Sequence, residues 1–324
     1  MTDLTRADQK HLMLFAGRSH PQLAGEIADL LGTELVPARM VTYANSEIYV
    51  QFKESVRGCD AFVIQSHVAP VNDNLMEQLI MIDALKRASA RRITVISPFY
   101  PYARQDKKHA GREPISARLV ADLFATAGAT RIMTVDLHAA QIQGFFNGPV
   151  DHLYAMPLLA DYVRDHYDLS NLVVVSPDAG RVRTTDQYSD RLHCPLAIIH
   201  KRRDPNQAHT VSVHEVVGDV EGKTCLLVDD MIDTAGTICL AADALKAKGA
   251  ARVIAAVTHP VLSGPAIDRL QNSAFEEVIV TNSLPVSAEQ RIDKLTVLSI
   301  APLLSAAIQA VFNDGSVAAL MNQQ

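Results

Sequence analysis

Short apolar runs rich in β-branched residues alternate with amphipathic stretches along most of this chain. In the first half, four runs have the length of strands: residues 11–15, 61–65, 92–96 and 131–135. Between them the apolar positions follow the helical period at residues 21–31, 74–88 and 115–126. Runs that are apolar on both faces and separated by helices indicate parallel sheets covered on two sides.

The second half of the chain repeats this alternation. Its strand-length runs are residues 172–175, 196–199, 224–228, 253–257, 278–281 and 295–300. One segment departs from the scheme, because residues 35–52 have the pattern of a β-hairpin that turns around residues 43–46 (YANS). The pattern therefore predicts an α/β fold with mainly parallel sheets flanked by helices and a hairpin excursion in the first half.

The length of the chain indicates two domains. One hydrophobic core rarely supports 324 residues, and about 150 residues per domain is usual. We place the division near residues 148–151, after the segment 141–146, which gives domains of residues 1–150 and 151–324.

Composition narrows the class of protein. With 48% hydrophobic and 20% charged residues and a net charge of -6, the chain resembles an ordinary globular protein, and a basic face for duplex nucleic acid is not expected. No apolar stretch approaches the 18 residues of a membrane span, and the N-terminus lacks a signal-peptide core. The four cysteines are widely spaced, so we expect reduced thiols in a cytoplasmic protein.

Acids and hydroxyls gather after one predicted strand in the second half, in residues 229–237 (DDMIDTAGT). Ligands of open α/β sheets bind beyond the carboxyl ends of the strands. Asp229 and Asp230 can accept hydrogen bonds from vicinal sugar hydroxyls, and the small residues before the predicted helix 238–246 leave backbone N–H groups for a phosphate. An ordinary capped helix needs only Asp233 or Thr234, so the full combination favours a sugar-phosphate site.

Three other strand ends carry candidate ligands for a nucleotide and a metal. Residues 98–102 (PFYPY) place aromatic side chains beside the charged run 102–116, which contains Arg104 and Arg112; this combination suits adenine or polyphosphate, although a solvated charged loop is the alternative. His138 and Asp178 follow two strands and could hold Mg²⁺ together with substrate oxygens. A structural, hydrogen-bonded histidine is the alternative for His138.

A cluster of cations follows the strand predicted at residues 196–199. Lys201, Arg202 and Arg203 are expected in a mobile loop that could close over a transferring phosphoryl group, and a solvated basic turn is the alternative. Residues 218–224 (GDVEGKT) look like a P-loop, but a P-loop follows a strand and opens a helix, whereas this segment precedes a strand. We therefore interpret residues 218–224 as a turn.

Over essentially its whole length the sequence resembles the ribose-phosphate diphosphokinase (PRPP synthetase) family. The stretches that carry the resemblance are ESVRGCD (54–60), PVNDNLME (70–77), IDALKRA (82–88), YARQD (102–106), REPI (112–115), DLHA (136–139), QIQGFF (141–146), KRR (201–203), DDMIDTAGT (229–237) and THPVLS (258–263). The resemblance implies two phosphoribosyltransferase-type α/β domains, an N-terminal ATP-side domain and a C-terminal ribose-phosphate-binding domain. It also implies Mg²⁺-dependent transfer of the β,γ-diphosphoryl group of ATP to the 1-hydroxyl of ribose 5-phosphate, releasing AMP.

The resemblance also assigns residues to roles. The ribose phosphate is held by Asp229, Asp233, Thr234, Ala235, Gly236 and Thr237 with the help of Arg203; ATP by Asn45, Ser46, Glu47, Arg104 and Gln105; Mg²⁺ by His138 and Asp178; and Lys201 is the catalytic lysine. Positioning and charge neutralisation are what phosphoryl transfer requires, which agrees with these residue types. Homo-oligomers, commonly hexamers, are implied as well.

The chain departs from the family pattern at three places. Asn45 and Ser46 replace a usual Asp-Gly, Arg181 replaces a usual glycine, and residues 184–186 (TTD) replace the Arg-Ala-Arg of many members. Arg181 or Arg183 could supply the charge missing at residues 184–186. Two other functions remain as alternatives: a salvage phosphoribosyltransferase, which would leave the first 150 residues unexplained, and a non-catalytic regulatory paralogue, which should have lost the loop cations or metal ligands.

Overall fold

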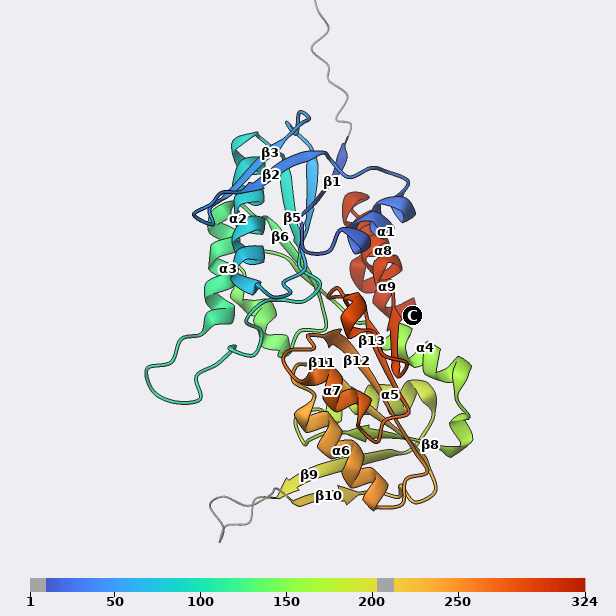
Figure 1. Cartoon of the computed structure of the whole chain (residues 1–324). Coiled ribbons are helices and arrows are strands. Elements are labelled where there is room, and N and C mark those ends of the chain that lie inside the picture. Colours follow the sequence, from blue (N-terminus) through green and yellow to red (C-terminus); the bar gives the residue numbers. More distant parts are fainter. Residues whose placement is uncertain (1–9, 203–212, 324) are drawn as a thin grey trace, which may run out of the picture. The chain divides into compact units, whose positions relative to one another are not determined.

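The structure of the protein is a computed structural model that describes residues 10–202 and 213–323 (Figure 1). The chain divides into two compact units. Unit 1 comprises residues 10–154, 283–285 and 300–323, and unit 2 comprises residues 155–282 and 286–299.

Unit 1 is built on a five-stranded sheet in the order β1-β4-β5-β6-β7, in which every neighbouring pair is parallel. Its strands are β1 (Leu12–Ala16), β4 (Asp60–Ile64), β5 (Arg92–Ile96), β6 (Arg131–Val135) and β7 (Val150–Leu153). Its helices are α1 (Pro21–Leu31), α2 (Val71–Arg87), α3 (Ser116–Ala127), η1 (Ala140–Phe145), α8 (Ala301–Phe312) and α9 (Val317–Gln323). Alternating strands and helices produce the parallel sheet that the sequence pattern predicts.

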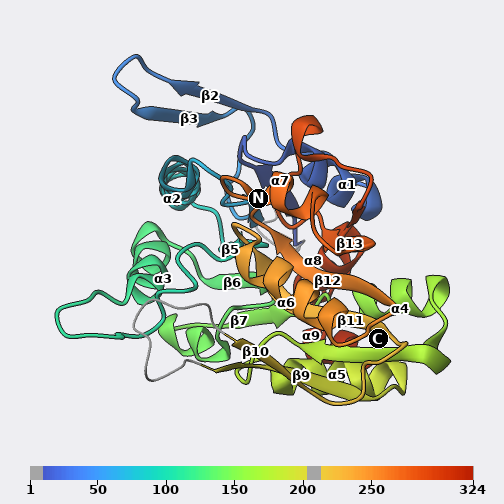
Figure 2. The same cartoon turned by 60° about the horizontal axis from the view of Figure 1, so that its bottom comes forward.

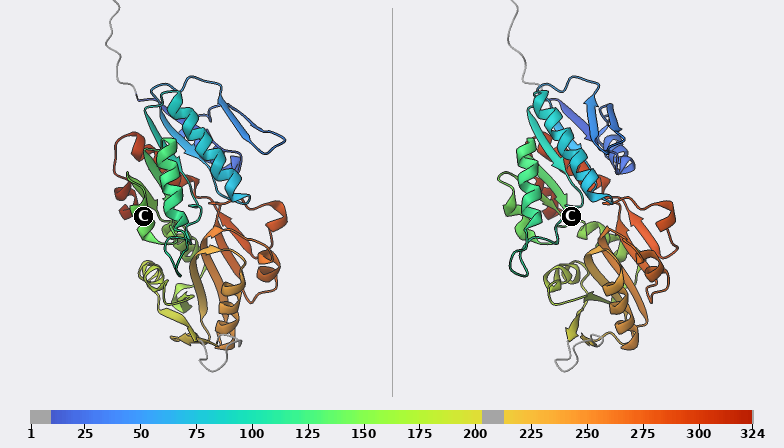
Figure 3. Two further views of the ribbon diagram at one scale, coloured as in Figure 1. Left: turned by 90° about the vertical axis from the view of Figure 1, so that its left-hand side faces the viewer. Right: turned by 60° about the vertical axis from the view of Figure 1, so that its left-hand side comes forward.

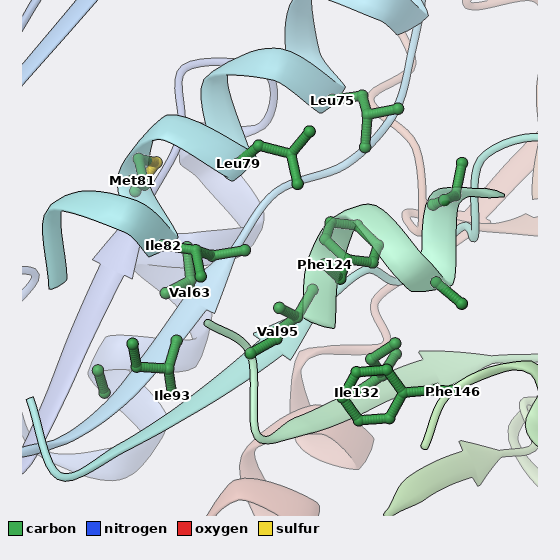
Figure 4. Packing of buried hydrophobic residues seen from close by; sticks show 14 of the residues in the cluster. Val63, Leu75, Leu79, Met81, Ile82, Ile93, Val95, Phe124, Ile132 and Phe146 are labelled. Atoms are coloured by element: carbon green, nitrogen blue, oxygen red, sulfur yellow. The ribbon is translucent and has the colours of Figure 1, made fainter. Parts of the chain in front are cut away.

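One hydrophobic cluster of unit 1 lies between its sheet and the helices α2 and α3, which lie side by side (Figure 3). Val63, Val95 and Ile132 point from three neighbouring strands toward Ile82 of α2 and Phe124 of α3 (Figure 4). Each of these side chains is at most 2% exposed. Burial of such apolar side chains makes the main favourable contribution to the free energy of packing the helices on the sheet.

The predicted hairpin of unit 1 is confirmed as a separate two-stranded sheet. β2 (Ala38–Thr42) pairs antiparallel with β3 (Ile48–Phe52), and Thr42 lies opposite Ile48. Ser46 in the turn has a φ of 72°, the left-handed conformation that tight hairpin turns need.

Unit 2 is built on a seven-stranded sheet in the order β10-β9-β8-β11-β12-β13-β14, parallel except for the edge strand β10. Its strands are β8 (Leu172–Ser176), β9 (Leu196–Arg202), β10 (Val213–Val217), β11 (Thr224–Ile232), β12 (Arg252–Pro260), β13 (Glu277–Thr281) and β14 (Leu295–Leu298). Its helices are α4 (Met156–His166), η2 (Leu169–Asn171), α5 (Val182–Leu192), α6 (Gly236–Ala247), α7 (Ala266–Gln271) and η3 (Ala288–Gln290). The helix α6 covers β11 and β12 (Figure 2).

The two units do not follow the predicted boundary of the domains. β7 pairs with β6 and continues the first sheet past residue 150, so the break comes after Tyr154. The last helices also return to unit 1, because α8 packs against α1 and buries Leu304 and Ile308. The assignment of residues 151–324 to one domain therefore needs this correction, while the roles assigned to the two domains stay predictions.

Three smaller expectations concern the turn, the thiols and membrane spans. Residues 218–223 form the predicted turn between β10 and β11. All four cysteines are free, and burial raises the pKa of Cys59, Cys194 and Cys225 to about 11, so these thiols are protonated near neutral pH. Within residues 10–202 and 213–323, no helix has the length and apolar character needed to cross a bilayer.

Candidate active site

The acids predicted at a strand end lie inside β11. The pattern ended this strand at residue 228, but β11 runs four residues further because β12 is equally long and pairs Asp229 with Val257 and Ile232 with Pro260. Asp229 is half-buried and Asp230 is buried. The strand therefore holds both carboxyl groups on a rigid backbone, where a binding group is positioned more accurately than on a loop.

The segment after β11 is a tight turn that opens α6. Ala235 caps the helix with a φ of 58°, and α6 begins at Gly236, two residues before the predicted start. Arg269 of α7 donates from Nη1 to the carbonyl oxygen of Thr234 at 2.9 Å. A Cβ at Gly236 would lie 3.1 Å from the same Nη1, so a larger residue there would crowd Arg269. The backbone N–H groups of the first helical turn lack intrahelical acceptors and can bind a phosphate.

Asp178 lies on the loop that follows β8, the strand next to β11. Its carboxylate is exposed, and Oδ1 accepts hydrogen bonds from the backbone N–H groups of Gly180 at 2.7 Å and Arg181 at 3.1 Å. The side chain is thereby fixed in orientation at the edge of the sheet where β11 carries its acids.

Arg181 pairs with both acids of β11. Its Nε lies 3.2 Å from Oδ1 of Asp229, and its Nη2 lies 2.5 Å from Oδ1 of Asp230. Burial, followed by the neighbouring Asp230, raises the pKa of Asp229 well above its ordinary value, and the Arg181 charge opposes this rise. Sequence reasoning considered Arg181 as a source of positive charge but missed these partners, and it missed Arg269 entirely.

The predicted loop of cations is partly wrong. Lys201 and Arg202 belong to β9, which extends to Arg202 because β10 pairs with it, Lys201 opposite His214. Arg203 lies outside the described residues. Lys201 thus stands on a strand adjacent to β8 in the sheet order, not on a free loop.

The other predicted residues belong to unit 1. Asn45, Ser46 and Glu47 form the exposed hairpin turn, in which the Glu47 N–H donates to Oδ1 of Asn45 at 3.2 Å. Arg104 and Gln105 are exposed on the loop before α3, and Ser116 donates to Oε1 of Gln105 at 2.6 Å.

The predicted metal ligands fall in different units. His138 is half-buried and lies just after β6 of unit 1, whereas Asp178 belongs to unit 2. Among the residues with described side chains, no three His, Cys, Asp or Glu groups form a cluster that could enclose a metal ion. Mg²⁺ sites commonly use only one or two protein carboxylates, with waters and substrate phosphates as the other ligands.

Comparisons with known proteins identify the family. Residues 12–128 match the N-terminal domain of ribose phosphate pyrophosphokinase, and residues 205–322 match the phosphoribosyl synthetase-associated domain. The chain is 64% identical to a ribose-phosphate pyrophosphokinase of Streptomyces coelicolor over 100% of both chains, and 60% identical to that of Mycobacterium tuberculosis over 97% of each.

A solved structure agrees with these relatives and with the predicted fold class. The crystal structure of phosphoribosylpyrophosphate synthetase from Mycobacterium smegmatis is similar with a TM-score of 0.90 at 60% identity, covering 94% of this chain and 100% of that chain. Similarity over nearly the whole length leaves neither half unexplained. The chain belongs to the ribose-phosphate pyrophosphokinase family.

Proposed function

We propose that this protein transfers the β,γ-diphosphoryl group of ATP to the 1-hydroxyl of ribose 5-phosphate, giving phosphoribosyl diphosphate and AMP for nucleotide biosynthesis. The observation that carries the proposal is the full-length similarity, at 60–64% identity, to proteins named ribose-phosphate pyrophosphokinase. The acids of β11 in front of the α6 turn support it independently, because sugar hydroxyls and a phosphate need that combination.

In this proposal the ribose phosphate binds at the carboxyl end of β11. Asp229 accepts hydrogen bonds from sugar hydroxyls, and the turn of Asp233, Thr234, Ala235, Gly236 and Thr237 surrounds the 5-phosphate with backbone N–H groups. Arg269 holds the turn closed through the carbonyl of Thr234. Arg203 adds a positive charge toward the phosphates.

The ATP contacts proposed for unit 1 are Asn45, Ser46 and Glu47 of the hairpin turn, with Arg104 and Gln105 of the loop before α3. Exposure of all five side chains leaves them accessible to a nucleotide. A guanidinium such as that of Arg104 can bind phosphate oxygens in a bidentate manner.

The transfer step relies on orientation and charge rather than on a covalent enzyme intermediate. The 1-hydroxyl attacks the β-phosphorus in line, the bond to the α-phosphate oxygen breaks, and AMP leaves. Lys201 stabilises the negative charge that develops on the transferring group. The backbone of Lys201 belongs to the regular strand β9.

The chemistry at Asp178 suits Mg²⁺. A carboxylate oxygen is a preferred ligand of this ion, and the two backbone N–H groups on Oδ1 hold the carboxylate in a fixed orientation. When bound, Mg²⁺ neutralises polyphosphate charge. His138 offers a nitrogen, which Mg²⁺ prefers less than oxygen, so its assignment rests on its place just after β6 and on the resemblance.

Two further proposals concern assembly and location. We expect a homo-oligomer, by resemblance a hexamer, with a mass by light scattering of about six times that of the 35.3 kDa chain. A cytoplasmic location is the other proposal, and fractionation of the source cells tests it.

The direct test incubates the purified chain with ATP, Mg²⁺ and ribose 5-phosphate and follows AMP and phosphoribosyl diphosphate by ³¹P NMR. AMP should appear only when the pentose phosphate is present. A parallel incubation with phosphoribosyl diphosphate and each free nucleobase tests the salvage reaction. Base-dependent release of diphosphate, or no AMP in the first reaction, would contradict the proposal.

A further inference from the structure

Arg181 contacts the two strand ends that carry the proposed site of unit 2. Arg181 is the N-cap residue of α5, and its backbone N–H donates to Oδ1 of Asp178 at 3.1 Å. Its guanidinium forms ion pairs with Asp229 and Asp230 of β11. The side chain is 17% exposed, so most of the guanidinium and its stem lie inside the protein. One residue therefore joins the loop after β8 to the acids of the next strand.

Arg181 is the cation that opposes protonation of the two adjacent acids. Asp229 and Asp230 are consecutive, and the Asp230 N–H donates to Oδ1 of Asp229 at 2.8 Å. Burial and mutual repulsion of the carboxylates both favour protonation, and Arg181 supplies the opposing charge. Both ion pairs end on an Oδ1 atom, so the planar guanidinium also fixes the rotation of each carboxylate.

The same geometry argues against a direct role for Arg181 in binding the diphosphate. Nε and Nη2 both face carboxylates in this structure, so a phosphate would have to break two ion pairs before it could bind them. The positive charge of Arg181 is thus paired with the two acids of β11. The interpretation from the sequence alone, that Arg181 supplies positive charge to the substrate, is refined accordingly.

We propose that Arg181 is a positioning residue for the pentose, one that holds the carboxylates of Asp229 and Asp230 oriented to accept hydrogen bonds from the vicinal hydroxyls of ribose 5-phosphate. This inference rests on the proposed function. It predicts an effect on pentose affinity that exceeds any effect on the turnover of bound substrates.

The test compares Arg181→Gln and Arg181→Lys with the unchanged protein. Arg181→Gln should raise the KM for ribose 5-phosphate by roughly 10- to 100-fold, the effect of losing one hydrogen-bonded charge, with kcat and the KM for ATP within about threefold. Arg181→Lys should give an intermediate KM, because an ammonium group restores the charge without the bidentate fork.

The matched control is Arg191→Gln on the same helix. Arg191 Nη2 lies 2.8 Å from Oδ1 of Asp161, an ion pair away from the acids of β11, so its loss should leave the KM for ribose 5-phosphate unchanged. Thermal unfolding of each variant reports whether it is folded. Calorimetric titration of ribose 5-phosphate into the protein measures binding without requiring turnover.

The outcomes separate the inference from the function on which it rests. An unchanged pentose KM in folded Arg181→Gln overturns the inference and leaves the function standing. A lower KM would mean that Arg181 competes with the sugar, and a dominant fall in kcat would mean that it acts on the diphosphate; either result also overturns it. If the unchanged protein makes no AMP, the proposed function fails, and calorimetry with the same variants still decides what Arg181 does for pentose binding.

Discussion

Each unit places an arginine beside a carboxylate at the carboxyl edge of its sheet, but the two arrangements have different charge balances. In unit 1, Glu77 of α2 is 2% exposed and pairs with Arg18 just after β1, Nε to Oε2 at 2.5 Å. The Arg18 N–H and Nε2 of Gln65 also donate to Glu77 Oε1, at 2.7 and 3.0 Å. In unit 2, the single guanidinium of Arg181 forms ion pairs with two carboxylates, those of Asp229 and Asp230.

The difference agrees with a structural role for Glu77 in unit 1 and with the binding role proposed for the acids of β11 in unit 2. Glu77 receives three protein hydrogen bonds and one cationic partner, so its charge is balanced inside the protein. Even the backbone fits this network closely, because a Cβ at Gly17 would lie 2.2 Å from Oε1 of Gln65. When both acids of β11 are ionised, their two negative charges exceed the single positive charge of Arg181 by one. Hydroxyl groups of a ligand can then donate hydrogen bonds to these carboxylates.

The largest effect on activity is expected from a substitution of Lys201 in β9 of unit 2. Lys201→Ala should lower kcat by roughly two orders of magnitude or more while the KM for ribose 5-phosphate changes little, because in the proposed mechanism the lysine stabilises charge that develops during transfer. Steady-state kinetics with both substrates measure the split. Lys223→Ala, before the amino end of β11, is the control, and a kcat for Lys201→Ala equal to that of the control would remove Lys201 from the mechanism.

A smaller effect, on affinity, is expected from Asp229→Ala. Loss of a charged hydrogen-bond acceptor for the sugar should raise the KM for ribose 5-phosphate by roughly 10- to 100-fold and leave the KM for ATP nearly unchanged. The matched variant is Asp219→Ala, an exposed acid in the turn before β11. If only the KM for ATP rose, Asp229 would belong to the binding site of the nucleotide and not to that of the pentose.

The smallest effect on activity is expected in unit 1. Glu77→Gln should lower the free energy of unfolding by about 1.5–3 kcal/mol, since Arg18 loses its buried anionic partner, while the KM for ribose 5-phosphate stays the same. Urea unfolding measures the first quantity. Asp83→Asn on the same helix breaks the exposed pair with Arg87 and should cost less than about 1 kcal/mol. Equal losses for the two variants would show that Glu77 is no more structural than a surface residue.

Much of the fold is predictable from the sequence because parallel strands and their covering helices have strong apolar patterns. The bounds of β5, β6 and α1 agree with the pattern to the residue. β7 was not predicted, since its four residues include Asp151 and His152 and show no apolar run. The sequence of α8 does not predict that this helix packs in unit 1, because an apolar helix face can cover either sheet.

The site was predictable as a set of residue types but not as a set of contacts. The segment 229–237 combines acids, hydroxyls and glycine in consecutive positions, so its chemistry is visible in the sequence. Arg181 lies 48 positions before Asp229, and no periodicity links the two; only the adjacency of β8 and β11 brings them together. The extension of β9 through Lys201 likewise depends on pairing with β10, which the polar sequence does not indicate.

A crystal structure of the protein with ribose 5-phosphate bound would test directly whether the acids of β11 bind the pentose. The vicinal hydroxyls should lie within hydrogen-bonding distance of the carboxylates of Asp229 and Asp230, with Arg181 still paired to them and the 5-phosphate at the turn that opens α6. A pentose phosphate bound at another part of the chain, with the acids of β11 facing only protein or solvent, would contradict this prediction.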